Sequence, residues 1–120
     1  MIIRLPWPDK KLSPNARLHW KATYAAKKKY KDLCAWELID QGVKPLNDPP
    51  KRLFVKLTFY PPANYRFDAD NLVSSTKYGL DMIANRLGVD DYIFAMQRPI
   101  IEKSQGKPGF VLVEITETEE

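Results

Sequence analysis

Apolar side chains recur at intervals of three and four residues in two stretches of the chain, which is the period of a helix with one buried face. The first stretch comprises Ala22, Ala26, Tyr30, Leu33, Cys34 and Leu38, and the second comprises Leu72, Thr76, Leu80, Ile83 and Leu87. Gly42 and Pro45 end the first helix. Asp70 or Asn71 can cap the start of the second, and Gly88 fits its end. The pattern therefore predicts two helices.

Four shorter stretches have the features of β-strands, namely residues 2–5, 53–60, 92–101 and 110–115. Pro99 interrupts the third of them. We expect strand 53–60, helix 71–87 and strand 92–101 to form a right-handed crossover with parallel strands, and the last two strands to pair antiparallel. The order β-α-β-α-β-β predicts an α/β (α+β) fold, in which a mixed sheet has two helices packed on it.

Length and composition limit the possible classes of protein. The 120 residues suit one domain over residues 1–120. The single cysteine, Cys34, excludes an intramolecular disulfide and a zinc ribbon, and we expect it to be a small core residue. The N-terminal segment has no apolar stretch long enough for a signal peptide or a membrane span. We therefore expect a cytoplasmic protein without a membrane partner.

Charge is divided unevenly along the chain. Residues 1–60 carry 13 Lys and Arg against 5 Asp and Glu, whereas residues 61–120 carry 6 against 10. Eight basic residues and no acidic one lie between Lys10 and Lys31. Such a segment is typical of proteins that bind a polyanion, although a solvated helix face would have the same composition. The lysines that would face DNA are Lys21, Lys27, Lys28, Lys29 and Lys31.

Two aspartates, Asp68 and Asp70, flank Ala69. In extended backbone, residues two apart point to the same face, and two carboxylates so placed ionise together readily only beside a cation. Mg²⁺ suits such hard oxygen ligands, and Mn²⁺ is a possible substitute. The competing interpretation is an ordinary helix cap and turn.

Asp90 and Asp91 follow the second helix and add two candidate metal ligands, although they also suit a polar loop. Lys77 lies seven residues beyond Asp70, which places it roughly on the same helical face. Because helical side chains lean toward the N-terminus, Lys77 can approach the first aspartate pair and meet a phosphate. An i,i+4 ion pair with Asp81 is the alternative.

A carboxylate cluster that holds Mg²⁺ is suited to phosphodiester hydrolysis, because the ion polarises the phosphoryl oxygen and lowers the pKa of its water. The basic segment would attract the DNA that the acidic site repels. Further candidates for DNA contacts are Asn15, Arg17, Arg66 and Phe67, the last by stacking on a base. Alternatively, Asn15 and Arg17 only stabilise a turn, and Phe67 is a core residue. His19 is expected to order a loop or touch a phosphate.

Several short motifs resemble the RusA family of Holliday junction resolvases and occur in the family's order along nearly the whole chain. They are LPWP at 5–8, SPNARLHW at 13–20, Asp-x-Asp-Asn-Leu at 68–72, Lys77, Leu80-Asp81 and Asp90-Asp91. The resemblance implies a homodimeric, Mg²⁺-dependent endonuclease that resolves four-way DNA junctions by paired nicks, in DNA recombination and repair. It implies catalytic roles for Asp68, Asp70 and Asp91. Asp90 is then a further metal ligand, and Lys77 assists.

One departure concerns the lysine. Some members of the family have it three residues closer to the second aspartate, where this chain has Ser74. The family is frequent in phages and prophages, so such a source is expected. The main alternative function is a non-catalytic, basic DNA-binding protein on the same scaffold, and a third is an interaction protein with a cation-stabilised acidic turn.

Helix length predicts how the metal site is built. Asp68 and Asp70 stand at one end of the second helix and Asp90 and Asp91 beyond the other, which separates the pairs by on the order of 20 Å. One ion or an ion pair cannot span that distance. A two-fold dimer with antiparallel helices would unite the pairs in two equivalent sites. A sharp kink or early helix end near Gly79 would instead unite them within one chain.

Overall fold

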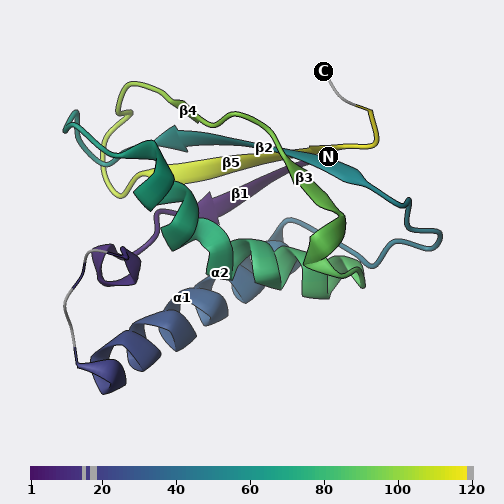
Figure 1. Ribbon diagram of the computed structural model, residues 1–120, viewed down its shortest axis with the longest axis horizontal. Helices are drawn as coiled ribbons and strands as arrows, with labels where there is room; N and C mark the ends of the chain where they lie inside the picture. The colour runs from purple at the N-terminus through teal and green to yellow at the C-terminus, as the bar shows by residue number, and fades with distance from the viewer. Residues whose placement is uncertain (15, 17–18, 119–120) are drawn as a thin grey trace.

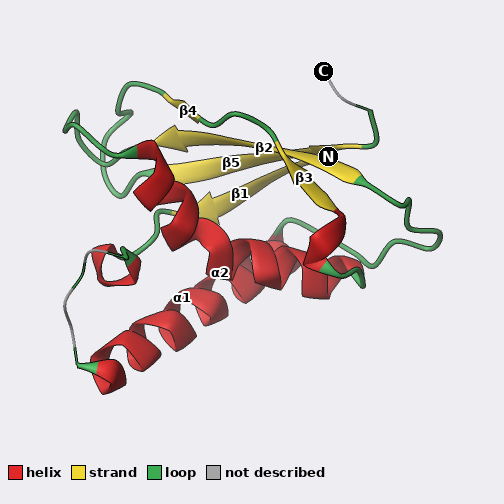
Figure 2. Ribbon diagram, in the orientation of Figure 1, coloured by secondary structure: helices red, strands yellow, loops and turns green. Residues whose placement is uncertain are grey.

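The computed structural model describes residues 1–14, 16 and 19–118. It has one mixed sheet with both long helices on the same face (Figures 1 and 2). The strands are β1 (Ile2–Pro6), β2 (Leu53–Tyr60), β3 (Phe94–Met96), β4 (Ile100–Ile101) and β5 (Phe110–Thr116). The helices are α1 (Trp20–Asp40) and α2 (Ala69–Leu87), with 3₁₀ turns η1 (Lys10–Leu12) and η2 (Asp91–Ile93). The predicted α+β class is confirmed. In the described ranges, neither helix is long and apolar enough to cross a membrane.

The predicted crossover through α2 is confirmed. The sheet order is β1-β5-β2-β3 with β4 also on β2, and β3 and β4 both run parallel to β2. These two strands are separate because the backbone leaves the ladder around Pro99, which has no N–H to donate. The first of them begins at Phe94 and not at residue 92, because η2 occupies residues 91–93.

The position of β5 differs from the prediction. It does not pair with the strand before it but lies antiparallel between β1 and β2. β3 and β4 already occupy one edge of β2, so the turn through Gly106 and Gly109 takes the chain to the other edge (Figure 1). There Val111, Val113 and Ile115 are buried against the helices. β5 thus becomes a central strand with both backbone edges hydrogen-bonded.

The core fills the space between the sheet and the helices. Its fully buried residues include Val55, Leu57, Phe59, Val111 and Val113 from the sheet and Cys34, Leu38, Ile83 and Leu87 from the helices. Cys34 is a core residue, as predicted. Burial raises the pKa of its thiol to about 12, so the thiol stays protonated and unreactive at neutral pH.

Gly79 lies where α2 passes closest to β1 and α1. A Cβ at this position would stand 2.8 Å from Leu5 Cδ1 and 3.2 Å from Cys34 Sγ, so the close approach depends on glycine. α2 remains helical through Gly79 and therefore does not end there. It bends near its middle (Figure 1), where the hydroxyls of Ser75 and Thr76 donate to carbonyls one turn earlier, a pattern that bends helices.

Candidate functional site

Asp68 is the N-cap of α2. Its backbone is extended, with φ −83° and ψ 120°, and its Oδ1 accepts a hydrogen bond from the Asn71 N–H at 3.1 Å. The cap was predicted at Asp70 or Asn71, which is wrong because helical backbone already starts at Ala69. The exposed carboxylate keeps its second oxygen for another ligand. Capping and metal binding by Asp68 are therefore compatible.

One face of α2 carries a polar row that we call the α2 stripe, formed by Asp70, Ser74, Lys77 and Asp81. Intervals of four, three and four residues place these side chains above one another on a helix. The first three are exposed and Asp81 is half-buried, whereas Leu72 and Ile83 on the opposite face are buried in the core. Ser74, the position where some members of the RusA family have their lysine, and Lys77 both lie on this stripe. A lysine at either position would therefore face the same side of α2.

At the C-terminal end of α2, Asp81, Asp90 and Asp91 form a second feature, which we call the acidic cluster. α2 ends at Gly88, whose φ of 75° is left-handed, and the chain turns back along the helix. Asp90 caps η2 by accepting a hydrogen bond from the Tyr92 N–H at 3.1 Å. A side-chain hydrogen bond with Asp81, then one with Asp90, raises the pKa of Asp91. Carboxylates close together disfavour each other's ionised form, and a nearby cation relieves this repulsion.

The candidate residues divide between the two ends of α2. Lys77, Asp81 and Asp91 line a depression of about 280 Å³. Asp68 lines a cavity of about 380 Å³ at the other end. About eleven residues separate Asp70 from Asp81, which is at most roughly 16 Å along the helix. Within the part of the chain that the structure describes, no group of three or more His, Cys, Asp or Glu side chains is placed to hold a metal ion.

The five lysines predicted to contact DNA from α1 fall into two sets. Lys21, Lys28 and Lys29 are exposed on α1. Lys27 and Lys31 are half-buried instead, and their ammonium groups lie 5.1 and 6.0 Å from the centre of the Tyr78 ring on α2. This second set therefore lies beside α2, over the ring of Tyr78, which follows Lys77 of the α2 stripe in sequence.

Other predicted DNA contacts lie at the start of both helices. His19 caps α1, because its Nδ1 accepts a hydrogen bond from the Lys21 N–H at 3.2 Å, which agrees with an ordering role. Arg66 is exposed and Phe67 is half-buried beside Asp68. Asn15 and Arg17 lie outside the described residues.

Asp81 lies in the acidic cluster beside Asp91, whereas the sequence indicated it only within the Leu80-Asp81 motif and as a possible partner of Lys77. The signal was present in the spacing, because Asp81 lies eleven residues after Asp70 and thus three turns along the same face. The proximity of Asp81 to Asp91 was harder to foresee, since it depends on the reversal of the chain at Gly88.

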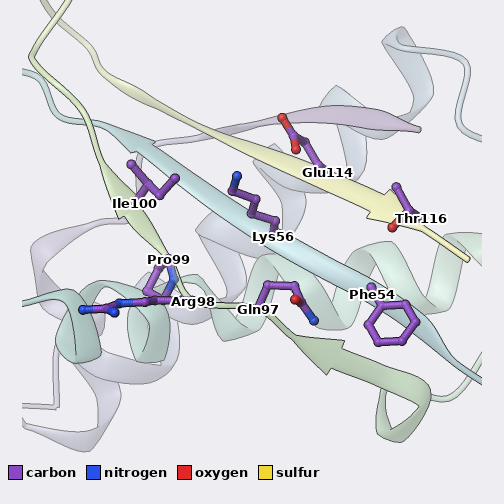
Figure 3. Close-up of a pocket in the computed structure, with 8 residues that line it drawn as sticks. All are labelled: Phe54, Lys56, Gln97, Arg98, Pro99, Ile100, Glu114 and Thr116. Atoms are coloured by element: carbon purple, nitrogen blue, oxygen red, sulfur yellow. The ribbon is translucent and has the colours of Figure 1, made fainter. Parts of the chain in front are cut away.

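A separate groove of about 300 Å³ lies on the sheet face away from the helices. Figure 3 shows Lys56 of β2 and Glu114 of β5 on adjacent strands, with Phe54 and Thr116 beside them. Its lining contains one carboxylate, Glu114. Because a magnesium site needs several oxygen ligands, we do not place the candidate site in this groove.

No protein-family model matches the chain. The chain is 37% identical over 115 residues to an uncharacterized protein of Xylella fastidiosa (strain Temecula1), and the match covers 95% of this chain and 74% of that protein.

Proposed function

This chain belongs to the same family as the Xylella fastidiosa protein, and we propose that it is a Mg²⁺-dependent endodeoxyribonuclease that resolves four-way DNA junctions by paired nicks. The proposal rests on the resemblance of its ordered motifs to the RusA family. The observation that carries it is the distribution of exposed charge along α2. Carboxylates stand at both ends of the helix, Lys77 stands between them, and Lys27 and Lys31 of α1 lie beside Tyr78 of α2.

The donor set fits a hard divalent cation. Asp68, Asp70, Asp90 and Asp91 would hold Mg²⁺, or Mn²⁺ in its place, through carboxylate oxygens. The neighbouring carboxylates of Asp81 and Asp90 raise the pKa of Asp91, and a bound cation would favour the ionised forms of all three groups. When bound, the ion supplies Lewis acidity and a water of lowered pKa. Lys77 is placed to stabilise negative charge on a phosphoryl group.

We further propose that two copies of the chain complete each site. An antiparallel pairing of the α2 stripes about a two-fold axis near Gly79 would set Asp70 of one chain beside the partner's Asp90 and Asp91. The same pairing would set Lys77 opposite the partner's Asp81, which makes the stripe complementary to itself in charge. This arrangement would give two equivalent metal sites, as paired nicks require.

The basic surface would bring DNA to this acidic site. Exposed Lys21, Lys28 and Lys29 can contact phosphates directly, and Lys27 and Lys31 add positive charge beside α2. Such contacts release counterions and depend strongly on salt.

The test is nicking of a synthetic four-way junction with Mg²⁺, compared with its linear duplex arms. The wild-type protein should nick the junction symmetrically, and Asp70→Asn should bind it equally well without cutting. A wild-type protein that binds but never cuts, with Mg²⁺ or Mn²⁺, would refute the nuclease assignment.

A second candidate function is a non-catalytic DNA-binding protein. It is favoured by one observation, namely that among the described residues of a single chain no group of three His, Cys, Asp or Glu side chains, the acidic cluster included, has the arrangement of a metal site. This alternative predicts junction binding without cleavage and no effect of Mg²⁺ on the thermal stability of the protein.

A further inference from the structure

We propose that the cavity beside Asp68 binds one unstacked nucleobase of the DNA, an inference that rests on the proposed function. The cavity measures about 380 Å³, which is within the range of small-ligand pockets. Its lining includes Trp7, Lys10, Arg66, Phe67, Asp68 and Asn71. It thus combines aromatic walls, a cationic rim and a proposed metal ligand.

The aromatic walls are held rigidly. Trp7 meets Phe67 edge-to-face at 5.4 Å and Phe59 at 6.1 Å, and both lining rings are half-buried. Rings that are already fixed lose little conformational freedom when a planar ligand stacks on them. Every nucleobase has a π-face, so such walls accept any base.

The polar groups of the cavity fit a nucleotide better than an apolar side chain. Exposed Lys10 and Arg66 can contact the phosphates on either side of an inserted base. The carboxamide of Asn71 offers a donor and an acceptor to a base edge, while its backbone N–H is occupied by Asp68. An apolar segment of another protein would gain nothing from these groups.

The position of the cavity identifies the base. Asp68 lines the cavity and is also a proposed metal ligand, so the inserted base belongs to a nucleotide next to the phosphate that is cut. At the crossover of a four-way junction, bases are unstacked at lower cost than within a duplex. The cavity would therefore favour branched DNA over linear DNA.

The experiment is a thermodynamic cycle between protein and DNA. The nicked phosphates are first located with Mg²⁺. Affinities are then measured with Ca²⁺ for junctions that carry one abasic site at each position within two nucleotides of the nick, or of the crossover point if no nick forms. Phe67→Leu keeps apolar volume but removes the ring, and Phe67→Tyr keeps the ring. Tyr65→Leu is the matched control, because Tyr65 is 72% exposed, contacts Phe67 at 6.3 Å and lies outside the cavity lining.

At one position, removal of the base should weaken wild-type and Phe67→Tyr binding by about 5- to 100-fold more than Phe67→Leu binding. No such coupling should appear at other positions or with Tyr65→Leu. Absence of coupling at every position, equal coupling for Tyr65→Leu, or no DNA binding at all would overturn the inference. Coupling without any cleavage would refute the nuclease activity and support the base-binding cavity. Cleavage without coupling would support the nuclease activity and refute the base-binding cavity.

Discussion

The two exposed lysines in the middle of the basic helix give the sharpest prediction about DNA binding. Lys28 and Lys29 are exposed, whereas Lys27 and Lys31 lie against Tyr78, so replacement of the exposed pair should leave the packing intact. Each lysine–phosphate contact contributes about 0.9 to the slope of log affinity against log salt. The Lys28→Gln/Lys29→Gln protein should therefore have a slope shallower by about 1.8. Between 50 and 200 mM salt it should lose roughly 12-fold less affinity than the wild type.

The assay is fluorescence anisotropy of a labelled junction over a series of NaCl concentrations. Lys103→Gln/Lys107→Gln is the matched control, because both residues are exposed in the connection between β4 and β5 and carry the same total charge. It should leave the slope unchanged. Equal slopes for the Lys28/Lys29 variant and the wild type would refute the reasoning and leave these lysines as a solvated helix face.

Three further predictions concern α2 and its ends. Gly79→Ala should destabilise the protein by about 1–2 kcal/mol in urea unfolding, because the new Cβ would overlap Leu5 in the core. The control Ser74→Ala, on the exposed α2 stripe, should leave stability unchanged. Unchanged stability of Gly79→Ala would contradict the close approach. Asp68→Ala should cost about 1 kcal/mol of stability because the helix cap is lost, whereas Asp68→Asn retains the cap. Both variants should lack nuclease activity. Equal stability of the two variants would contradict the capping role. The pKa of Asp91 is higher in the folded protein than in the unfolded chain, so folding takes up protons. The ionised carboxyl therefore opposes folding, and this cost grows as the pH rises from the ordinary pKa of an aspartate to the raised one. In metal-free buffer Asp91→Asn should therefore raise Tm at pH 7, and the difference should vanish below about pH 3; a Tm difference independent of pH would contradict this.

The secondary structure could be predicted because it depends on local patterns. The three-and-four spacing of apolar residues from Ala22 to Leu38 and from Leu72 to Leu87 marks the buried faces of α1 and α2, except that Leu33 is 46% exposed. Pro99 marks the break between β3 and β4. The place of β5 could not be predicted in this way. Alternation shows which side chains of Phe110–Thr116 face the core, but it does not specify which strands lie on either side.

The candidate site was predictable as a set of residue types but not as an arrangement. Short motifs made Asp68, Asp70 and Asp91 candidates. Their division between two ends of α2 followed from helix length. The contact of Asp91 with Asp81 depends on how sharply the chain turns after Gly88, which is a property of tertiary packing. The separation of Lys27 and Lys31 from the other lysines likewise depends on where α1 crosses Tyr78.

Mixing two inactive variants tests most directly whether each metal site of the proposed junction nuclease is completed by two copies of the chain. Asp70→Asn lacks a carboxylate at the start of α2, and Asp91→Asn lacks one beyond its end. In a heterodimer, one site would combine both lost groups, while the other would keep the wild-type Asp70 of one chain and the wild-type Asp91 of its partner. The mixture should therefore regain nicking of a four-way junction with Mg²⁺, one strand at a time, although each protein alone is inactive. Verified subunit exchange without any return of nicking would contradict the shared site.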